Sequence, residues 1–306
     1  MRVLSASLLC LIVLAGASAQ TAGKGKPVVN FNIELDLDKF PQKTPQEALG
    51  SVVKALADGR VDYVLAHLAD PAFVQARLKD SGAHDACTRR AVETARLLAD
   101  VATDPPPFLV LSDDNATDPI RTLNAGRITP NMGLTPAEWK TFTDGAMQVA
   151  SSVLDQTGLR TVFHHHSAGY VETPDEIARF LDLTDATRIG LVFDTGHYCF
   201  GAGRSAAVEG LERFKERVWY VHLKDCHPGI ANRVQAENLN YFDALRLGVF
   251  CELGRGCVDF PGVLRWLNEN HYPGYVLVEQ DVLPGMGTPK ASALRNREYL
   301  RSIEPA

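Results

Sequence analysis

Acidic and imidazole side chains end several apolar stretches in the second half of the sequence. The four in this position are His164, Asp194, His222 and Glu279. Carboxylates and imidazoles together suit Mn²⁺, Co²⁺, Fe²⁺ or Zn²⁺, and a set without thiolates does not suit a soft metal. Each residue alone is equally compatible with a satisfied polar group at a strand end, but together the four would repel one another or stay unpaired without a cation. We therefore predict that they bind one divalent metal ion.

A lysine stands beside this set. Lys224 follows His222 by two residues, and side chains alternate along a strand, so both should face the same cavity. A metal and other cations nearby would lower the pKa of Lys224, which favours a role in proton transfer and substrate binding. The alternative is a lysine that pairs with Asp225 at the rim.

Two histidines are further candidates for catalysis. In the triplet that begins at His164, the same alternation places His166 on the face of His164 and His165 on the other face, so we expect His165 to be structural. His197 lies just beyond the stretch that ends at Asp194. It can bind substrate, although a surface histidine is equally compatible with this position.

Two charged residues lie in predicted loops. Arg127, in the sequence Asn-Ala-Gly-Arg, is a candidate for binding substrate hydroxyls, and a solvated loop arginine is the alternative. Glu172 precedes a capped helix, where we expect the helix dipole to stabilise its negative charge.

The apolar stretches alternate with amphipathic helical patterns. The strand-like stretches are Phe108–Leu111, Thr161–Phe163, Gly190–Phe193, Trp219–Leu223 and Tyr275–Val278. Capping boxes at 135–138 and 173–176 predict two of the intervening helices. Buried strands separated by helices indicate repeated βα units and a parallel sheet. In a (β/α) TIM barrel the carboxyl ends of the strands converge on the active site, which is where the candidate residues lie.

The N-terminal part of the chain has a different pattern. A positive start, an apolar run from Val3 to Ala15 and the small residues at 17–19 predict a signal peptide over residues 1–19, and hence export to the periplasm or medium. Residues 20–83 are predicted to form a linker and a small, mostly helical module. It contains an alternating segment at 29–37, a capped helix ending at Ala57, and helical stretches over 62–68 and up to Leu78. The barrel-like domain is expected over 84–306.

Composition excludes some classes of function. With a net charge of −6 and scattered lysines and arginines, the chain is not expected to bind nucleic acid. No stretch after residue 19 predicts a membrane span. Beyond the signal the chain has Cys87, Cys199, Cys226, Cys251 and Cys257, with no CxxC pair, so we predict buried thiols and neither a zinc knuckle nor a disulfide framework.

From about residue 84 to 306 the sequence resembles the xylose isomerase-like TIM barrels and, among them, the inosose dehydratases. The resemblance rests on NAGRITP, TVFHHHSAGYVETPDEI, GLVFDTGHYCFGAG, YVHLKD, LGRGCVDF and YVLVEQD. It implies a divalent metal, Mn²⁺ or Co²⁺ first and Zn²⁺, Fe²⁺ or Mg²⁺ as alternatives, held by Asp194, His222 and Glu279. His164 stands where many relatives have a metal-binding glutamate. A small polyol or sugar is the implied partner, and a homo-oligomer is compatible.

The resemblance implies a lyase that dehydrates a keto-inositol through an enediolate intermediate. Lys224, His166 and His197 are the candidate catalytic residues, and Arg127, His166 and Lys224 the candidate substrate contacts. An isomerase or epimerase of the same superfamily is one alternative. Residues 20–83 are too few for the three βα units that precede this part of the family's barrel, so we predict a barrel incomplete or atypical at its N-terminal strands. Either the barrel is open, or another chain completes it, or the protein is a degenerate or fused relative. A non-catalytic sugar-binding module is therefore the second alternative.

Overall fold

The computed structural model describes residues 29–30, 33–58, 60, 63–68, 81–101 and 105–304. The chain divides into two compact units, Met1–Ala86 and Cys87–Ala306. The predicted signal peptide 1–19, the linker 20–27 and the helical stretch ending at Leu78 lie outside the described residues.

The first unit contains a short hairpin and a capped helix. Strands β1 (Val29–Asn30) and β2 (Ile33–Glu34) pair antiparallel, so the alternating segment forms a local hairpin. Helix α1 (Pro45–Ala57) begins at the predicted capping box, where Thr44 and Glu47 exchange hydrogen bonds of 3.2 Å. The stretch predicted as a second helix forms the π-helix η2 (Val64–Leu68).

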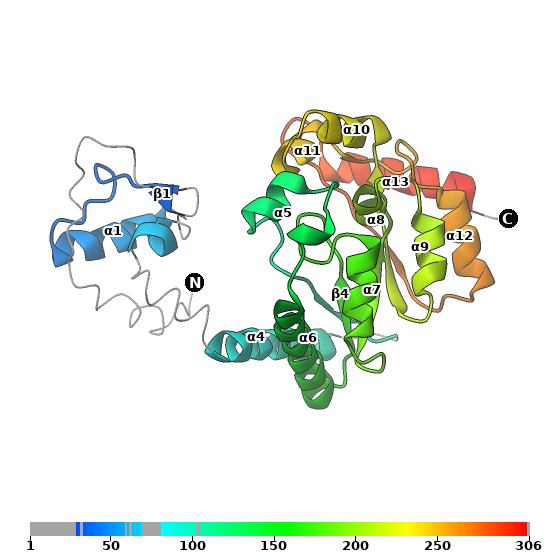
Figure 1. Cartoon of the computed structure of the whole chain (residues 1–306), viewed down its shortest axis with the longest axis horizontal. Helices are drawn as coiled ribbons and strands as arrows, with labels where there is room; N and C mark the ends of the chain where they lie inside the picture. Colours follow the sequence, from blue (N-terminus) through cyan, green and yellow to red (C-terminus); the bar gives the residue numbers. More distant parts are fainter. Residues whose placement is uncertain are drawn as a thin grey trace. The chain divides into compact units, whose positions relative to one another are not determined.

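The second unit is built on a five-stranded parallel sheet (Figure 1). Its order is β3-β4-β5-β6-β9. The strands are β3 (Leu109–Leu111), β4 (Thr161–His164), β5 (Ile189–Asp194), β6 (Val218–Leu223) and β9 (Val276–Val278). All five apolar stretches predicted as strands are confirmed within about a residue. The short strands β7 (Asp225–Cys226) and β8 (Phe250–Cys251) pair antiparallel after β6.

Helices precede, connect and follow the strands of the sheet. In chain order they are α4 (Ser81–Asp100), α5 (Pro119–Asn124), η3 (Pro130–Met132), α6 (Pro136–Thr157), α7 (Pro174–Asp182), α8 (Thr195–Ala202), α9 (Ala207–Phe214), α10 (Pro228–Ala236), α11 (Tyr241–Leu247), α12 (Phe260–Glu269) and α13 (Pro289–Ile303). Both predicted capping boxes are present at the starts of α6 and α7. Among the described residues, no helix is long and apolar enough to cross a bilayer.

One face of the sheet forms the core with the helices. Ile189 and Leu191 of β5 are fully buried in one apolar cluster with side chains of α7, α9 and α12. Phe163 of β4 packs on Phe180 of α7 with ring centroids 4.2 Å apart. Strands β4 and β5 are buried along their whole length, which explains why their sequences show no polar alternation.

The sheet does not close into a barrel. Strands β3 and β9 are its two edges, and within the described part of the chain no further strand pairs with either. Val110 on β3 and Val276 and Leu277 on β9 are exposed. The prediction of an incomplete TIM-barrel-like fold is therefore confirmed.

Candidate metal centre

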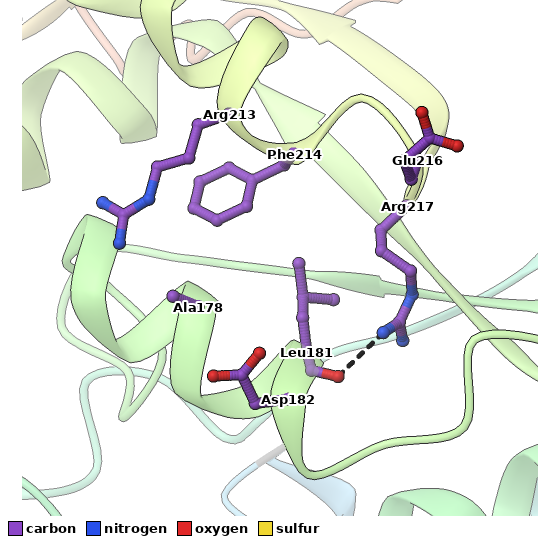
Figure 2. Close-up of a pocket in the computed structure, with 7 residues that line it drawn as sticks. All are labelled: Ala178, Leu181, Asp182, Arg213, Phe214, Glu216 and Arg217. Carbon is purple, nitrogen blue, oxygen red and sulfur yellow. Dashed lines mark hydrogen bonds between the residues drawn. The ribbon is translucent and has the colours of Figure 1, made fainter.

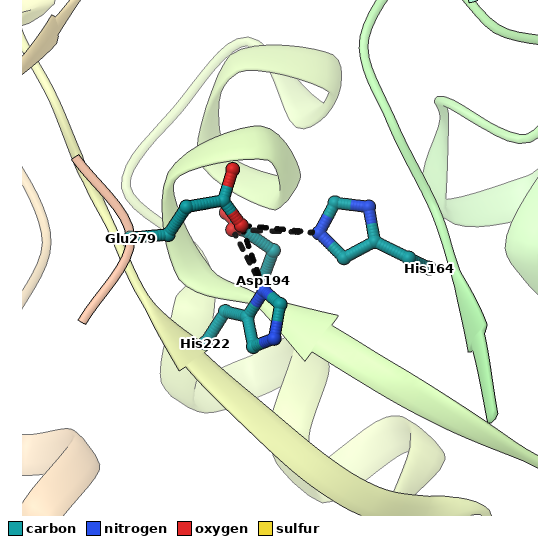
Figure 3. Close-up of side chains that lie close together, drawn as sticks. All are labelled: His164, Asp194, His222 and Glu279. Carbon is teal, nitrogen blue, oxygen red and sulfur yellow. Dashed lines mark hydrogen bonds and ion pairs between the residues drawn. The ribbon is translucent and has the colours of Figure 1, made fainter. Parts of the chain in front are cut away.

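The four predicted metal ligands meet at the carboxyl ends of neighbouring strands (Figure 3). One ligand atom from each lies within 4.8 Å of the others. His164 Nε2 is 3.7 Å from both Asp194 Oδ2 and Glu279 Oε2. His222 Nδ1 is 2.8 Å from the same Glu279 oxygen and 3.9 Å from Asp194 Oδ2. Residues separated by as many as 115 positions are thus brought together because parallel strands end at one edge of the sheet.

These separations fit a shared ion. Ligand atoms about 2.1 Å from a tetrahedral metal lie about 3.4 Å from one another, within the range seen here. His164 Nε2 and Asp194 Oδ2 are buried and have no hydrogen-bond partner among the described residues. Since an unpaired buried polar atom is costly, a cation between them would satisfy both lone pairs. The donor set of two imidazoles and two carboxylates suits Mn²⁺, Fe²⁺, Co²⁺ or Zn²⁺.

Both carboxyl groups are held in their charged form. Burial opposes the ionisation of Asp194, but the neighbouring His164 and Lys224 outweigh it and lower its pKa. Burial is likewise outweighed at Glu279, where the hydrogen bond with His222 and the ammonium of Lys224 lower the pKa. Two carboxylates that stay ionised are the form that binds a divalent cation.

Lys224 lies in the same site, where carboxylates surround its ammonium group. Its Nζ is 2.9 Å from Glu279 Oε1 and 3.2 Å from Asp281 Oδ2, and its side chain is almost fully buried. Burial alone would lower the pKa of Lys224, but the surrounding carboxylates outweigh it and raise the pKa. These carboxylates belong to Asp194, Glu279 and Asp281. A buried cation among three anions is stabilised as a cation. The lowered pKa expected for Lys224 beside a bound metal ion stays a prediction.

Asp281 is a site residue that the sequence argument missed. It follows Glu279 by two residues, so the alternation that linked His222 to Lys224 could have indicated it. The predicted alternative partner of Lys224, Asp225, has a different role. Its carboxylate accepts hydrogen bonds from the backbone N–H groups of Gly254 (2.9 Å), Gly256 (2.8 Å) and Val258 (3.1 Å). It therefore braces the loop that leads into α12.

His165 supports the ligands from behind. Its Nε2 accepts the backbone N–H of Asp194 at 3.1 Å, and the ring is fully buried. Burial lowers the pKa of His165 to about 3, so the ring is neutral at physiological pH. The expected structural role is confirmed: the neutral imidazole links the end of β4 to the end of β5.

His166 and His197 lie beside the ligands with their ring centroids 3.8 Å apart. The Ser167 carbonyl can only accept, so its 2.8 Å contact with His166 Nδ1 places a proton on that nitrogen and leaves Nε2 as an acceptor. In His197 the roles of the two ring nitrogens are exchanged. Its Nδ1 accepts the backbone N–H of Ser167 at 3.3 Å, so in the neutral ring the proton is on Nε2. Burial lowers the pKa of His166 to about 4 and that of His197 well below its usual value.

His197 is positioned by the strand end itself. Asp194 is the N-cap of α8, and its Oδ1 accepts the backbone N–H of His197 at 2.8 Å while Oδ2 faces the other ligands. The ring is buried, and its Nε2 has no hydrogen-bond partner among the described residues. The alternative of a surface loop histidine is therefore wrong.

Arg127 has its guanidinium in contact with backbone carbonyls. It donates to Val234 O at 3.2 Å, to Leu239 O at 3.0 Å and to Leu123 O. These contacts connect the loop after α5 to the end of α10. Substrate binding by Arg127 stays a prediction, and the contacts favour a structural role instead.

Glu172 precedes α7, and its buried carboxylate connects two loops. Its two carboxylate oxygens accept the N–H groups of Gly126 and Ala168, each at 2.6 Å. Burial raises the pKa of Glu172 to about 7, against the lowering effect of both hydrogen bonds. Glu172 directly precedes Thr173, the N-cap of α7, and stabilisation of its charge by the helix dipole stays a prediction.

The sequence profile described as "Xylose isomerase-like TIM barrel" matches residues 116–303, which is more than half of the chain. The chain belongs to this family. The match covers all four ligand positions and every strand of the sheet except β3.

Curated relatives of this xylose isomerase-like chain include inosose dehydratases. That of Clostridium beijerinckii is 34% identical over 164 residues, which cover 54% of each chain. That of Geobacillus kaustophilus is 35% identical over 167 residues, covering 55% of this chain and 53% of the relative. The chain thus spans about half the length of these relatives. In fold it is similar to a xylose isomerase domain protein from Planctomyces limnophilus, with a TM-score of 0.50, 15% identity, and coverage of 71% of this chain and 65% of that one.

A buried ion pair also stabilises the xylose isomerase-like site, and the sequence argument did not find it. The Arg121 guanidinium donates to both Glu176 oxygens at 2.8 and 2.9 Å and to the carbonyl of Gly169 at 2.8 Å. Arg121 is fully buried. Glu176 was predicted only as the capping-box acid of α7. The second role joins residues 55 positions apart, which local sequence patterns cannot show.

A surface pocket lies at the other end of the strands (Figure 2). It is lined by Ala178, Leu181, Asp182, Arg213, Phe214, Glu216 and Arg217. Arg217 directly precedes β6 and donates to Leu181 O at 2.7 Å and Ile189 O at 2.8 Å, so it ties together the amino ends of β5 and β6. In TIM-barrel enzymes this end serves stability, and chemistry takes place at the carboxyl end.

Proposed function

We propose that this chain is a metal-dependent lyase that removes water from a keto-inositol. The observation that carries the proposal is the convergence of His164, Asp194, His222 and Glu279, whose ligand atoms lie within 4.8 Å of one another. The identity to inosose dehydratases over about half their length supports the choice of substrate class.

The reaction requires loss of a proton from the carbon next to the ketone, followed by loss of a hydroxyl group from the next carbon. A divalent ion held by the four ligands would supply a Lewis acid that stabilises the negative charge developing on oxygen in the first step. We assign the proton transfer to His166, because its Nε2 is an unprotonated acceptor and the residue is partly exposed at the site.

Two further residues of the site, His197 and Lys224, would donate hydrogen bonds to the substrate. The protonated Nε2 of His197 would donate to a substrate oxygen, a contact that would satisfy a buried N–H. Lys224 is held as a cation by Glu279 and Asp281, and its Nζ would donate to the departing hydroxyl. Its raised pKa suits a fixed positive charge better than it suits a general base.

The proposal is tested by incubating the full chain with Mn²⁺ and 2-keto-myo-inositol. Dehydration gives a conjugated, enolised diketone, which new ultraviolet absorbance and a mass loss of one water would detect. His166→Asn should lower kcat by about 10²- to 10⁴-fold with metal still bound, since general-base catalysis contributes about this much. His271→Asn changes an exposed histidine and is the matched control.

The alternatives give different readouts in the same assay. An epimerase or isomerase would exchange the α-hydrogen with D₂O without losing water. The open edges at β3 and β9 favour a non-catalytic sugar-binding module as the second candidate, which would bind the keto-inositol without either change. Turnover of substrate at equal rates with and without Mn²⁺ would contradict the proposed role of the metal.

We also propose that the chain is exported, on the basis of the signal-peptide pattern in residues 1–19. N-terminal sequencing after expression in a bacterial host tests this. A periplasmic protein that starts at Gln20 is the expected result, and a cytoplasmic protein that retains Met1 would contradict it.

A further inference from the structure

Three cysteines from separate parts of the chain lie close together. Cys199 lies on α8, Cys226 on β7, and Cys257 in the loop that Asp225 braces. The thiol of Cys257 is hydrogen-bonded to the thiols of both Cys199 and Cys226. Cys199 and Cys226 are buried, and Cys257 is partly exposed. The proposed reaction uses none of these thiols.

The backbone brings Cys226 and Cys257 close enough for a disulfide. The N–H of Cys257 donates to the carbonyl of Cys226 at 2.9 Å. Residues bonded in this way have their Cα atoms roughly 5 to 6 Å apart, the range in which disulfides form. The other side of Cys257 is fixed as well, because the Ser205 hydroxyl donates to its carbonyl. The backbone of Cys257 is therefore held on both sides next to Cys226.

Cys251 and Cys87, the other two cysteines in the described part of the chain, do not share the backbone contact between Cys226 and Cys257. Cys251 pairs with Asp225 across the β7–β8 ladder, so its side chain is on the opposite face of that ladder from Cys226, which pairs with Phe250. Cys87 is exposed on α4. The prediction of buried thiols is thus confirmed for Cys199 and Cys226 and is wrong for Cys87, while Cys251 and Cys257 are only partly buried.

Cys257 is also the member of the group suited to attack. Hydrogen bonds from the thiols of Cys199 and Cys226 stabilise its thiolate and lower its pKa, although burial acts in the opposite direction. The same contacts and burial raise the pKa of Cys199 and of Cys226. A partly exposed thiolate next to two protonated thiols has both the nucleophile and the resolving group that disulfide exchange requires.

We propose that Cys199, Cys226 and Cys257 form a redox site in which Cys257 is oxidised to an internal disulfide, first with Cys226. The oxidant is a small-molecule disulfide. The Cys257 thiolate attacks one sulfur of the oxidant and releases one small thiol, which leaves a mixed disulfide on Cys257. The Cys226 sulfur then attacks the Cys257 sulfur, and the second small thiol leaves after Cys226 loses its proton. The protein loses two hydrogens and the oxidant gains them. Cys199 remains a thiol in contact with the new bond and can exchange with it.

The experiment uses the full chain, incubated with oxidised glutathione and then alkylated and mapped by mass spectrometry. The expected result is alkylation of two fewer cysteines than in the reduced protein, with a cross-linked peptide joining Cys226 to Cys257. Cys226→Ser should move the bond to Cys199 and Cys257, and Cys257→Ser should abolish it. Cys251→Ser is the matched control and should leave the bond unchanged.

Wild-type protein that keeps all of these thiols reduced under conditions that oxidise a dithiol reference would overturn the proposal. A disulfide that joins other cysteines, or one that persists in Cys257→Ser, would also overturn it. Because the readout is the mapped bond in wild-type protein, a variant that fails to fold does not affect the test. The outcome is also independent of whether the metal site is catalytic.

Discussion

The central strands and the edge strands of the same sheet differ in how they present a metal ligand. His164 and Asp194 are the last residues of β4 and β5, and His222 is the last but one of β6. These strands are paired on both sides, and the three side chains are 7%, 0% and 7% exposed. Glu279 follows the edge strand β9, and its side chain is 33% exposed. Five parallel strands therefore suffice to bring the four ligands together. Whether a strand is paired on one side or on both determines how far its ligand is shielded from solvent.

The two edges also differ from each other. On the β3 side, the loops are held by the buried Arg121–Glu176 pair and by the two hydrogen bonds to Glu172. On the β9 side, Tyr275, Val276 and Leu277 are exposed. Removing the buried ion pair on the β3 side is expected to cause the largest loss of stability.

Arg121→Met should lower the free energy of unfolding by about 3 to 5 kcal/mol, because removing one partner of a buried ion pair leaves the other charge uncompensated. Urea unfolding followed by circular dichroism measures it. The double variant Arg121→Met with Glu176→Gln should recover part of the loss. A single variant as stable as wild type would mean that the pair does not brace the β3 side.

The same truncation at the centre and at the edge sharpens the first comparison. Leu191→Ala on β5 removes a fully buried side chain and should cost about 2 to 5 kcal/mol. Leu277→Ala on β9 removes one that is 43% exposed and should cost less than about 1 kcal/mol. Equal losses in urea unfolding would show that β9 is covered in solution, for example by another chain.

Glu172 makes stability depend on pH. Its folded pKa of about 7 is above the usual value, so the folded state holds the proton more tightly than the unfolded state. Its contribution is therefore favourable at low pH and is lost as the pH rises from about 4.5 to about 7, at most about 3 kcal/mol for a fully buried group. Glu172→Gln should flatten this part of the stability profile measured by urea unfolding. An equally steep decline in the variant would assign the pH dependence to other groups.

The smallest effect is expected at Asp281. It contacts Lys224 at 3.2 Å and is not among the four ligands. Asp281→Asn should therefore change Mn²⁺ affinity by less than about tenfold, the lower end of effects from residues that only support ligands. Titration calorimetry with Mn²⁺ measures it, and a loss as large as that of a ligand variant would place Asp281 in direct contact with the ion.

Much of the site could be predicted from the sequence because its residues lie at the ends of short, apolar strands. The apolar stretches fixed where β4, β5 and β6 end, and residues at those ends must meet at one edge of a parallel sheet. Alternation within a strand correctly separated His165 from His164 and linked Lys224 to His222. These are local rules, and they hold wherever a strand is buried on both faces.

The rest depends on contacts that no local rule describes. The inward position of Glu172 and the pairing of Arg121 with Glu176 depend on how loops after different strands pack together. The raised pKa of Lys224 depends on the carboxylates of Asp194, Glu279 and Asp281, which come from two different strand ends and meet only in the folded sheet. The guanidinium of Arg127 donates hydrogen bonds to the carbonyls of Val234 and Leu239, which lie more than 100 positions away in the sequence.

The most direct test of the central claim is the amount of Mn²⁺ bound by wild type, Asp194→Asn and Glu279→Gln after equilibrium dialysis, measured by elemental analysis. Both substitutions keep the size of the side chain and remove its charge. We predict about one ion per chain in wild type and a loss of at least about 100-fold in affinity in Asp194→Asn, at the buried centre, because a carboxylate ligand supplies both charge and geometry. Glu279→Gln should lose affinity as well, and equal Mn²⁺ in all three proteins would contradict a shared metal site.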